Sequence, residues 1–116
     1  GSIIIISSIA AIKGSPILGA YNISKAADVM IVKNIATEFG HKNIRANSIA
    51  PGLIKTDFAK ALWENPDILN SVLSSTPMKR IGKPDEIAGV AIMLASDAGN
   101  YINGQTIVVD GGTTIS

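Results

Sequence analysis

The chain has 116 residues, of which 47% are apolar and 16% are charged, and its formal net charge is +1. This balance excludes a disordered chain, and a charge near neutrality gives no electrostatic basis for binding nucleic acid or an anionic membrane surface. The absence of cysteine and the single histidine exclude disulfides, thiolate metal sites and multi-histidine metal cages. No apolar run reaches the roughly 18 residues of a membrane span, and no signal-peptide pattern opens the chain. We therefore expect no metal, nucleic-acid or membrane partner, and a cytoplasmic location.

The first half of the chain predicts a strand, a long helix and a second strand. The β-branched run over residues 2–7 does not alternate, which suits a strand buried on both faces of a parallel sheet. Residues 20–39 show a helical period, with Gly40 as a plausible C-cap. Residues 43–50 predict the second strand, which the following Pro-Gly pair stops. Apolar side chains form one stripe of the predicted helix: Ile23, Ala26, Ala27, Met30, Ile31, Ile35 and Phe39.

The second half predicts three helices and a last strand. Thr56 and Asp57 mark the N-cap region of a short helix, and residues 65–67 (Asn-Pro-Asp) open another. A longer helix starts at Pro84, and residues 105–109 predict the third strand. This alternation is typical of crossover units on a parallel sheet, so we predict an α/β fold with about three parallel strands and helices. One face of the longer helix carries apolar side chains: Ile87, Val90, Ala91 and Leu94.

The isoleucine-rich strand at residues 2–7 has the sequence of a central strand, yet it comes first in the chain. In a three-stranded sheet built in chain order it would be an edge, with unpaired backbone groups and apolar faces that invite association. We therefore expect residues 1–116 to be the C-terminal part of a larger α/β domain.

Three polar residues could form an acid/base site. Tyr21 and Lys25 are four residues apart at the start of the predicted long helix, so they share one face. A free tyrosine loses its proton only near a pH of about 10, and a neighbouring ammonium stabilises the phenolate. Ser8 follows the first strand at the carboxyl edge of the sheet, where ligands bind in open α/β folds. On their own, an exposed Tyr–Lys pair and a strand-end serine have ordinary structural explanations.

Further motifs follow in a fixed order. Ser8 precedes Tyr21 by thirteen positions, residues 47–56 read NSIAPGLIKT, residues 80–88 read RIGKPDEIA, and residues 101–112 contain YINGQ and VVDGG. Together they resemble the classical branch of the short-chain dehydrogenase/reductase family, and the resemblance runs from residue 3 to residue 112. A lone Tyr-x-x-x-Lys is weak evidence, whereas the ordered set is highly specific.

The resemblance implies that residues 1–116 are the C-terminal part of a single doubly wound, Rossmann-type domain whose N-terminal dinucleotide-binding half is absent. It also implies an oxidoreductase that transfers a hydride between NAD or NADP and a small-molecule carbonyl or alcohol substrate, as part of a longer parent chain. Tyr21 would be the acid/base for the substrate oxygen. Lys25 would stabilise the Tyr21 phenolate and bind the nicotinamide ribose, and Ser8 would orient and polarise the substrate oxygen. Pro51 and Gly52 would pack beside the nicotinamide. Ile54 and Thr56 would contact the nicotinamide most directly, and Tyr21 and Lys25 would also bind the cofactor. The resemblance also implies a homo-oligomer, a dimer or a tetramer.

The stretch at residues 53–80 would cover the substrate. Its apolar side chains suggest a lipophilic or bulky substrate, although packing of two short helices onto the core explains them equally well. Residues 50–56, together with the Leu-Trp pair at residues 62–63, add a narrower resemblance to carbonyl and retinal reductases. Asp110 is expected to fix a turn. Asn103 stands where the family usually has threonine, which leaves one local hydrogen bond open.

The sequence lacks the Gly-x-x-x-Gly-x-Gly phosphate loop with which the family grips the pyrophosphate. We therefore expect weak or no cofactor binding by the 116 residues alone. The alternative function is a non-catalytic truncated fragment or an association module. A sugar epimerase or dehydratase of the extended branch also shares Tyr-x-x-x-Lys, but the Pro-Gly-x-Ile-x-Thr segment argues against it.

Overall fold

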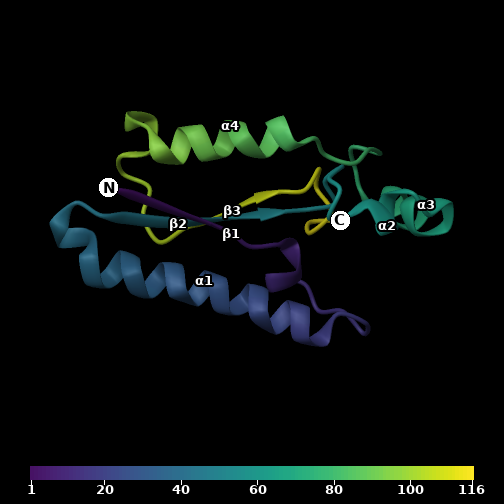
Figure 1. Cartoon of the computed structure of the whole chain (residues 1–116), viewed down its shortest axis with the longest axis horizontal. Helices are drawn as coiled ribbons and strands as arrows, with labels where there is room; N and C mark the ends of the chain where they lie inside the picture. Colours follow the sequence, from purple (N-terminus) through teal and green to yellow (C-terminus); the bar gives the residue numbers. More distant parts are fainter.

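A parallel sheet lies between two long helices in the computed structural model, which describes all 116 residues (Figure 1). The strands β1 (Ser2–Ile6), β2 (Arg45–Pro51) and β3 (Thr106–Val109) are arranged in the order β1-β2-β3. Helix α1 (Gly19–Phe39) covers one face and helix α4 (Pro84–Ala95) covers the other. The predicted α/β class with three parallel strands is confirmed.

The central strand β2 forms the buried middle of the molecule. Its residues 45–50 are all buried, because β1 and β3 flank it and both long helices pack on it. Strand β1 pairs on one side only, with Ser2 opposite Arg45 and Ile6 opposite Ile49. It is therefore the edge that its place in the chain predicts, and the side chain of Ile6 is 49% exposed.

The buried face of α1 differs from the predicted apolar stripe. Ile23, Met30 and Ile31 are exposed, whereas Val32 and Ala36 are buried against Ala46 of β2. The buried stripe is shifted around the helix, and it begins with half-buried polar side chains rather than with apolar ones. Apolar periodicity therefore indicates the helix but does not identify the face that contacts the sheet. In α4 the predicted face is confirmed, with Leu94 fully buried.

Helix α1 ends at Phe39 as predicted, whereas β2 begins two residues later than predicted. Gly40 is the C-cap of α1 but has a right-handed conformation and starts a short 3₁₀ helix, η2 (Gly40–Lys42). Asn43, with φ of 58°, is the left-handed residue that ends η2. Strand β2 then includes Pro51 as its last residue instead of stopping before it.

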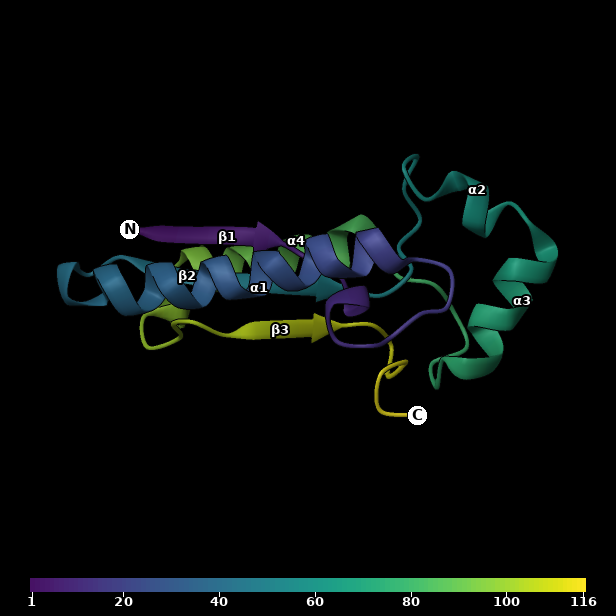
Figure 2. The same ribbon diagram turned by 90° about the horizontal axis from the view of Figure 1, so that it is seen from below.

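The segment between β2 and α4 holds two short helices, α2 (Lys60–Trp63) and α3 (Pro66–Ser75). Asn65 caps α3 as predicted, since its side chain accepts from the backbone N–H groups of residues 67 and 68. Thr56 is not the N-cap of α2, which starts four residues later behind Ala59. Figure 2 shows both helices beyond the carboxyl ends of the strands, to one side of the sheet.

Two asparagines connect β2 to the turn before β3. Asn47 is fully buried, donates to the carbonyl of Ile102 at 2.8 Å and accepts from the N–H of Gln105 at 2.9 Å. Asn103 accepts from the N–H of Ala46 at 2.9 Å. The local hydrogen bond that the sequence left open at Asn103 is therefore made, with an amide as the acceptor. None of the helices combines the length and apolar character that crossing a membrane would need.

Asn47→Leu should lower the free energy of unfolding by about 2 kcal/mol, because the substitution removes the buried amide that donates to the carbonyl of Ile102 and accepts from the N–H of Gln105. Urea denaturation measures this. Asn34→Ala, at an exposed position of α1, is the control and should change stability by less than about 0.5 kcal/mol. Equal stabilities of the two variants would contradict the role assigned to Asn47.

Candidate active site at the end of strand β1

Two adjacent serines follow strand β1, and their side chains make different contacts. The buried Ser7 continues the sheet through its N–H to the carbonyl of Ile49, and its hydroxyl donates to the backbone carbonyl of Lys25 at 2.8 Å. Ser8 caps the 3₁₀ helix η1 (Ile9–Ala11), where its Oγ accepts from the N–H of Ala10 at 3.1 Å. The hydroxyl hydrogen of Ser8 remains free to donate to a ligand oxygen.

Tyr21 and Lys25 are half-buried, whereas Ile23 and Ser24 between them are exposed, so both side chains lie on the side of α1 that is turned toward the protein. Helix α1 packs beside η1. The Tyr21 phenol makes no hydrogen bond within the chain, so its oxygen is available to another molecule. The Lys25 ammonium is 5.9 Å from the centre of the Tyr21 ring and donates to the carbonyl of Ile6 at 3.2 Å. The structure thus brings the helix pair to the carboxyl end of β1, beside the turn that carries Ser8.

Asp28 is a second partner of Lys25. Its carboxylate lies 3.3 Å from the Lys25 ammonium, and about a quarter of each side chain is exposed. A lysine ammonium has three N–H donors, so the bonds to Ile6 and Asp28 leave one for a further acceptor. Sequence reasoning missed both Asp28 and Ser7. The i, i+3 spacing of Asp28 from Lys25 was a usable signal, whereas nothing local marked Ser7.

Residues 51–56 leave the sheet as a tightly held segment. A Cβ atom on Gly52 would come within 2.9 Å of the Asp110 backbone, so only glycine allows the ends of β2 and β3 to approach this closely. Further on, Gly82 donates to the carbonyl of Leu53 and accepts from the N–H of Lys55, as a one-residue parallel bridge. The half-buried Ile54 side chain packs against Gly82. The predicted cofactor segment is therefore fixed by two glycine contacts.

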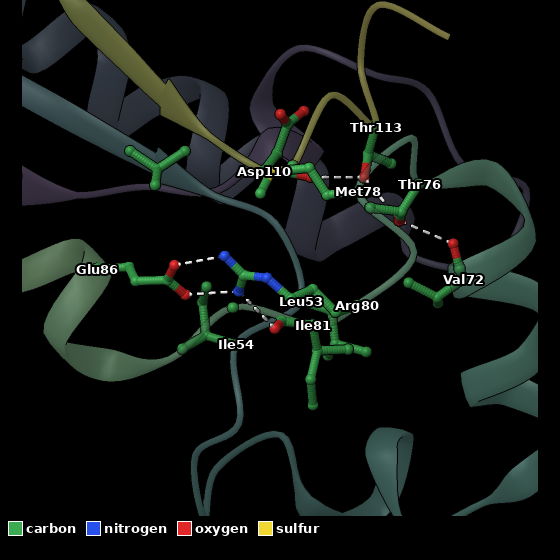
Figure 3. A pocket seen from close by; sticks show the side chains of 13 residues that line it. Leu53, Ile54, Val72, Thr76, Met78, Arg80, Ile81, Glu86, Asp110 and Thr113 are labelled. Carbon is green, nitrogen blue, oxygen red and sulfur yellow. Dashed lines mark hydrogen bonds and ion pairs between the residues drawn. The ribbon is translucent and has the colours of Figure 1, made fainter.

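A cavity of about 120 Å³ lies beside this segment, between the ends of β2 and β3 and the turn before α4 (Figure 3). Leu53 and Ile54 form part of its wall, so the cavity adjoins the predicted cofactor segment. Ser8, Tyr21 and Lys25 do not line it. Its remaining wall comes from Val72, Thr76, Met78, Arg80, Ile81, Gly82, Glu86, Val109, Asp110, Gly111 and Thr113.

Carboxylates on the wall of this cavity are engaged in internal contacts. Glu86 forms a two-point ion pair with Arg80, seen in Figure 3, at 2.6 and 2.9 Å, and accepts from the N–H of Lys83. The hydrogen bonds from Arg80, and then the one from Lys83, lower the pKa of Glu86 to about 2. The same contact raises the pKa of Arg80.

Asp110 fixes a turn, as expected from its Asp-Gly-Gly context. Its two carboxylate oxygens accept from the N–H groups of Gly112 and Thr114, each at 2.8 Å. Partial burial by itself raises the pKa of Asp110, but hydrogen bonds from residues 112–114 outweigh burial, so the net pKa is lowered. Asp110 therefore stays ionised and holds the turn after β3.

Comparison with known proteins finds relatives along nearly the whole chain. Residues 1–114 match the family model described as enoyl-(acyl carrier protein) reductase. Dehydrogenase/reductase SDR family member 4 from Bos taurus is 49% identical over 113 residues, which are 97% of this chain and 40% of that protein. A 3-oxoacyl-[acyl-carrier-protein] reductase from Chlamydia trachomatis is 47% identical over 97% of this chain and 44% of that protein. The chain spans less than half the length of these relatives.

Solved structures share the fold at high similarity. A gluconate 5-dehydrogenase from Burkholderia cenocepacia, solved with NADP and tartrate, superposes with a TM-score of 0.96 at 36% identity, over all of this chain and 46% of that one. A 4-hydroxyisoleucine dehydrogenase complexed with NADH and succinate (a mutant protein) gives 0.96 at 34% identity, over all of this chain and 48% of that one. The three strands and their helices are thus a recognisable part of a larger Rossmann-like fold.

The lowered pKa of Glu86 predicts a pH-dependent stability. A carboxyl group whose pKa is lowered by folding stabilises the fold at pH values above its pKa in the unfolded chain, near 4.5. This contribution is lost as the pH falls from 4.5 toward the folded-state pKa of about 2. Glu86→Gln should therefore be less stable than the parent protein at about pH 6, with the difference shrinking toward about pH 3. Urea midpoints at both pH values measure this. Asp85→Asn, at the neighbouring carboxylate outside the ion pair, should not reproduce the effect.

Proposed function

The chain belongs to the short-chain dehydrogenase/reductase family, and on that premise we propose that it is the C-terminal part of an oxidoreductase that moves a hydride between NAD(P)(H) and a carbonyl or alcohol. The observation that carries the proposal is the position of Tyr21 and Lys25. Both lie on the protein-facing side of α1, and the Lys25 ammonium is held at the carboxyl end of β1 by the carbonyl of Ile6.

Each polar residue has a task that its contacts support. Tyr21, whose phenol is free of internal bonds, gives a proton to the substrate oxygen during reduction and takes it back during oxidation. Lys25 places a positive charge beside Tyr21 and keeps one N–H for the nicotinamide ribose. Ser8 uses its free hydroxyl hydrogen to orient and polarise the same substrate oxygen.

The donor set fits the nicotinamide end of the cofactor, which supplies the hydride when it is bound. Thr56 accepts from the N–H of Ala59 through its Oγ, so its hydroxyl hydrogen remains available for the carboxamide. Pro51, Gly52 and Ile54 pack beside the nicotinamide. Related enzymes solved with NADP and NADH support this choice of cofactor. The chain lacks a glycine-rich phosphate loop, so in this proposal the parent protein supplies the pyrophosphate contacts, and residues 1–116 alone bind weakly or not at all.

The substrate is proposed to be a small-molecule carbonyl or alcohol, as for a carbonyl reductase. Two of the relatives are a 3-oxoacyl-[acyl-carrier-protein] reductase and a gluconate 5-dehydrogenase, and their carbonyl–alcohol conversions support the reaction type. A homo-oligomer and a cytoplasmic location complete the proposal. The exposed apolar face of α1, with Ile23, Met30 and Ile31, supports association.

The unpaired edge of β1 favours a second candidate, a non-catalytic association module, because open strand edges recruit partners. Turnover separates the two candidates. An enzyme requires Tyr21, whereas an association module retains its assembly, measured by light scattering, after that side chain is changed.

Tyr21→Phe in the full-length protein should reduce turnover at least about a hundredfold, because the substitution removes the proton donor and little else. Steady-state kinetics with NADH and NADPH measure this. Tyr101→Phe is the matched control, since Tyr101 is fully exposed, and it should turn over like the parent. Equal activity of the two variants would exclude the acid/base role of Tyr21.

A further inference from the structure

Trp63 contacts the predicted cofactor segment at two neighbouring residues. Its indole N–H donates to the backbone carbonyl of Thr56 at 2.8 Å. The ammonium of Lys55 lies 5.2 Å from the centre of the indole ring, within the range of a cation–π interaction. The side chain is half-buried, and it is the chain's single tryptophan. A single residue of α2 therefore contacts two consecutive residues of the segment at positions 51–56.

Helix α2 depends on such contacts for its position. It has four residues, no side-chain N-cap and no fully buried residue, and helices this short are not stable by themselves in water. Figure 2 shows it standing off the sheet next to α3. Trp63 is therefore an anchor of α2, and the anchor is attached to Thr56 rather than to the hydrophobic core.

The segment is held from both sides. On the side of α4, Gly82 bonds to the backbone of Leu53 and Lys55. On the side of α2, Trp63 holds the carbonyl of Thr56, and the N–H of Ala59 is shared between the carbonyl and the hydroxyl of Thr56. The Gly82 contact fixes where the segment leaves the sheet. The Trp63 contact fixes the peptide that follows the Thr56 side chain.

We infer that Trp63 is a positioning residue for the cofactor: it holds Thr56 in the orientation in which Thr56 meets the nicotinamide carboxamide, and it links occupancy of that site to the placement of α2 and α3. The inference rests on the proposed function, since it takes from it the role of Thr56. It assigns to the tryptophan a part in cofactor binding, whereas its apolar character alone suggested only substrate cover or packing.

The test is direct titration of the full-length protein with NADH and with NADPH by calorimetry, comparing variants that remove one contact at a time. Trp63→Phe keeps the aromatic ring but removes the N–H donor, and should weaken the binding of the preferred cofactor by about three- to tenfold, the value of one neutral hydrogen bond. Lys55→Met removes only the cation and should weaken it less. Glu64→Gln, which breaks the exposed Lys60–Glu64 pair of the same helix, is the control and should leave binding unchanged.

A spectroscopic readout separates positioning from a loss of structure. With Trp63 beside the nicotinamide, excitation of tryptophan should produce emission from bound NADH or NADPH by energy transfer, and Trp63→Phe should remove that component. The melting temperature of the variants should stay close to that of the parent protein. Unchanged cofactor affinity in Trp63→Phe would overturn the inference, as would equal weakening in Glu64→Gln.

The turnover of Tyr21→Phe and the cofactor binding of Trp63→Phe together distinguish a failure of this inference from a failure of the proposed function. If Tyr21→Phe retains full turnover while Trp63→Phe weakens cofactor binding, the acid/base assignment fails and the positioning role stands. If Tyr21→Phe abolishes turnover while Trp63→Phe binds cofactor like the parent, the positioning role fails alone. If the wild-type protein binds neither NADH nor NADPH, both fail together.

Discussion

The attachment of α1 to the end of β1 is the contact on which the candidate site depends. The Ser7 hydroxyl donates to the backbone carbonyl of Lys25, and the Lys25 ammonium donates to the backbone carbonyl of Ile6. Two reciprocal hydrogen bonds therefore fix the same helical turn to the same strand end. Tyr21 lies one helical turn before Lys25. This attachment therefore also determines where Tyr21 lies relative to the sheet and to Ser8.

Much of the architecture could be predicted from the sequence because it rests on local signals. The β-branched run of β1 and the Asn-Pro-Asp start of α3 specify strand and cap chemistry by themselves. The buried face of α1 was predicted wrongly, because Ile23 and Met30 are as apolar as a core stripe and only the tertiary arrangement decides which face meets β2. A helix with apolar residues on more than one side does not reveal its inner face through periodicity.

The site shows the same division between local and long-range information. The spacing of Tyr21 and Lys25 on one helix made their pairing predictable, and the position of Ser8 at a strand end placed it at the carboxyl edge. The bridge between Ile54 and Gly82 joins residues far apart in sequence, and glycine carries no side-chain signal of its partner. Trp63 was visible as an apolar residue, but its bond to a backbone carbonyl depends on the course of the loop and could not be derived from residue type.

The two halves of the site differ in how firmly they are built, and this difference has a functional consequence. The half formed by β1 and α1 is continuous with the buried residues Val32, Ala36 and Ala46, so it cannot move without disturbing the core. The half formed by residues 51–80 has no fully buried residue in either of its helices and is fastened at a few points. Local opening costs least where few apolar contacts are buried. In the proposed function, the firmly held pair of Tyr21 and Lys25 stays in place while the loosely fastened helices α2 and α3 admit substrate and cofactor, so affinity is set at the points where these helices are fastened rather than in the core.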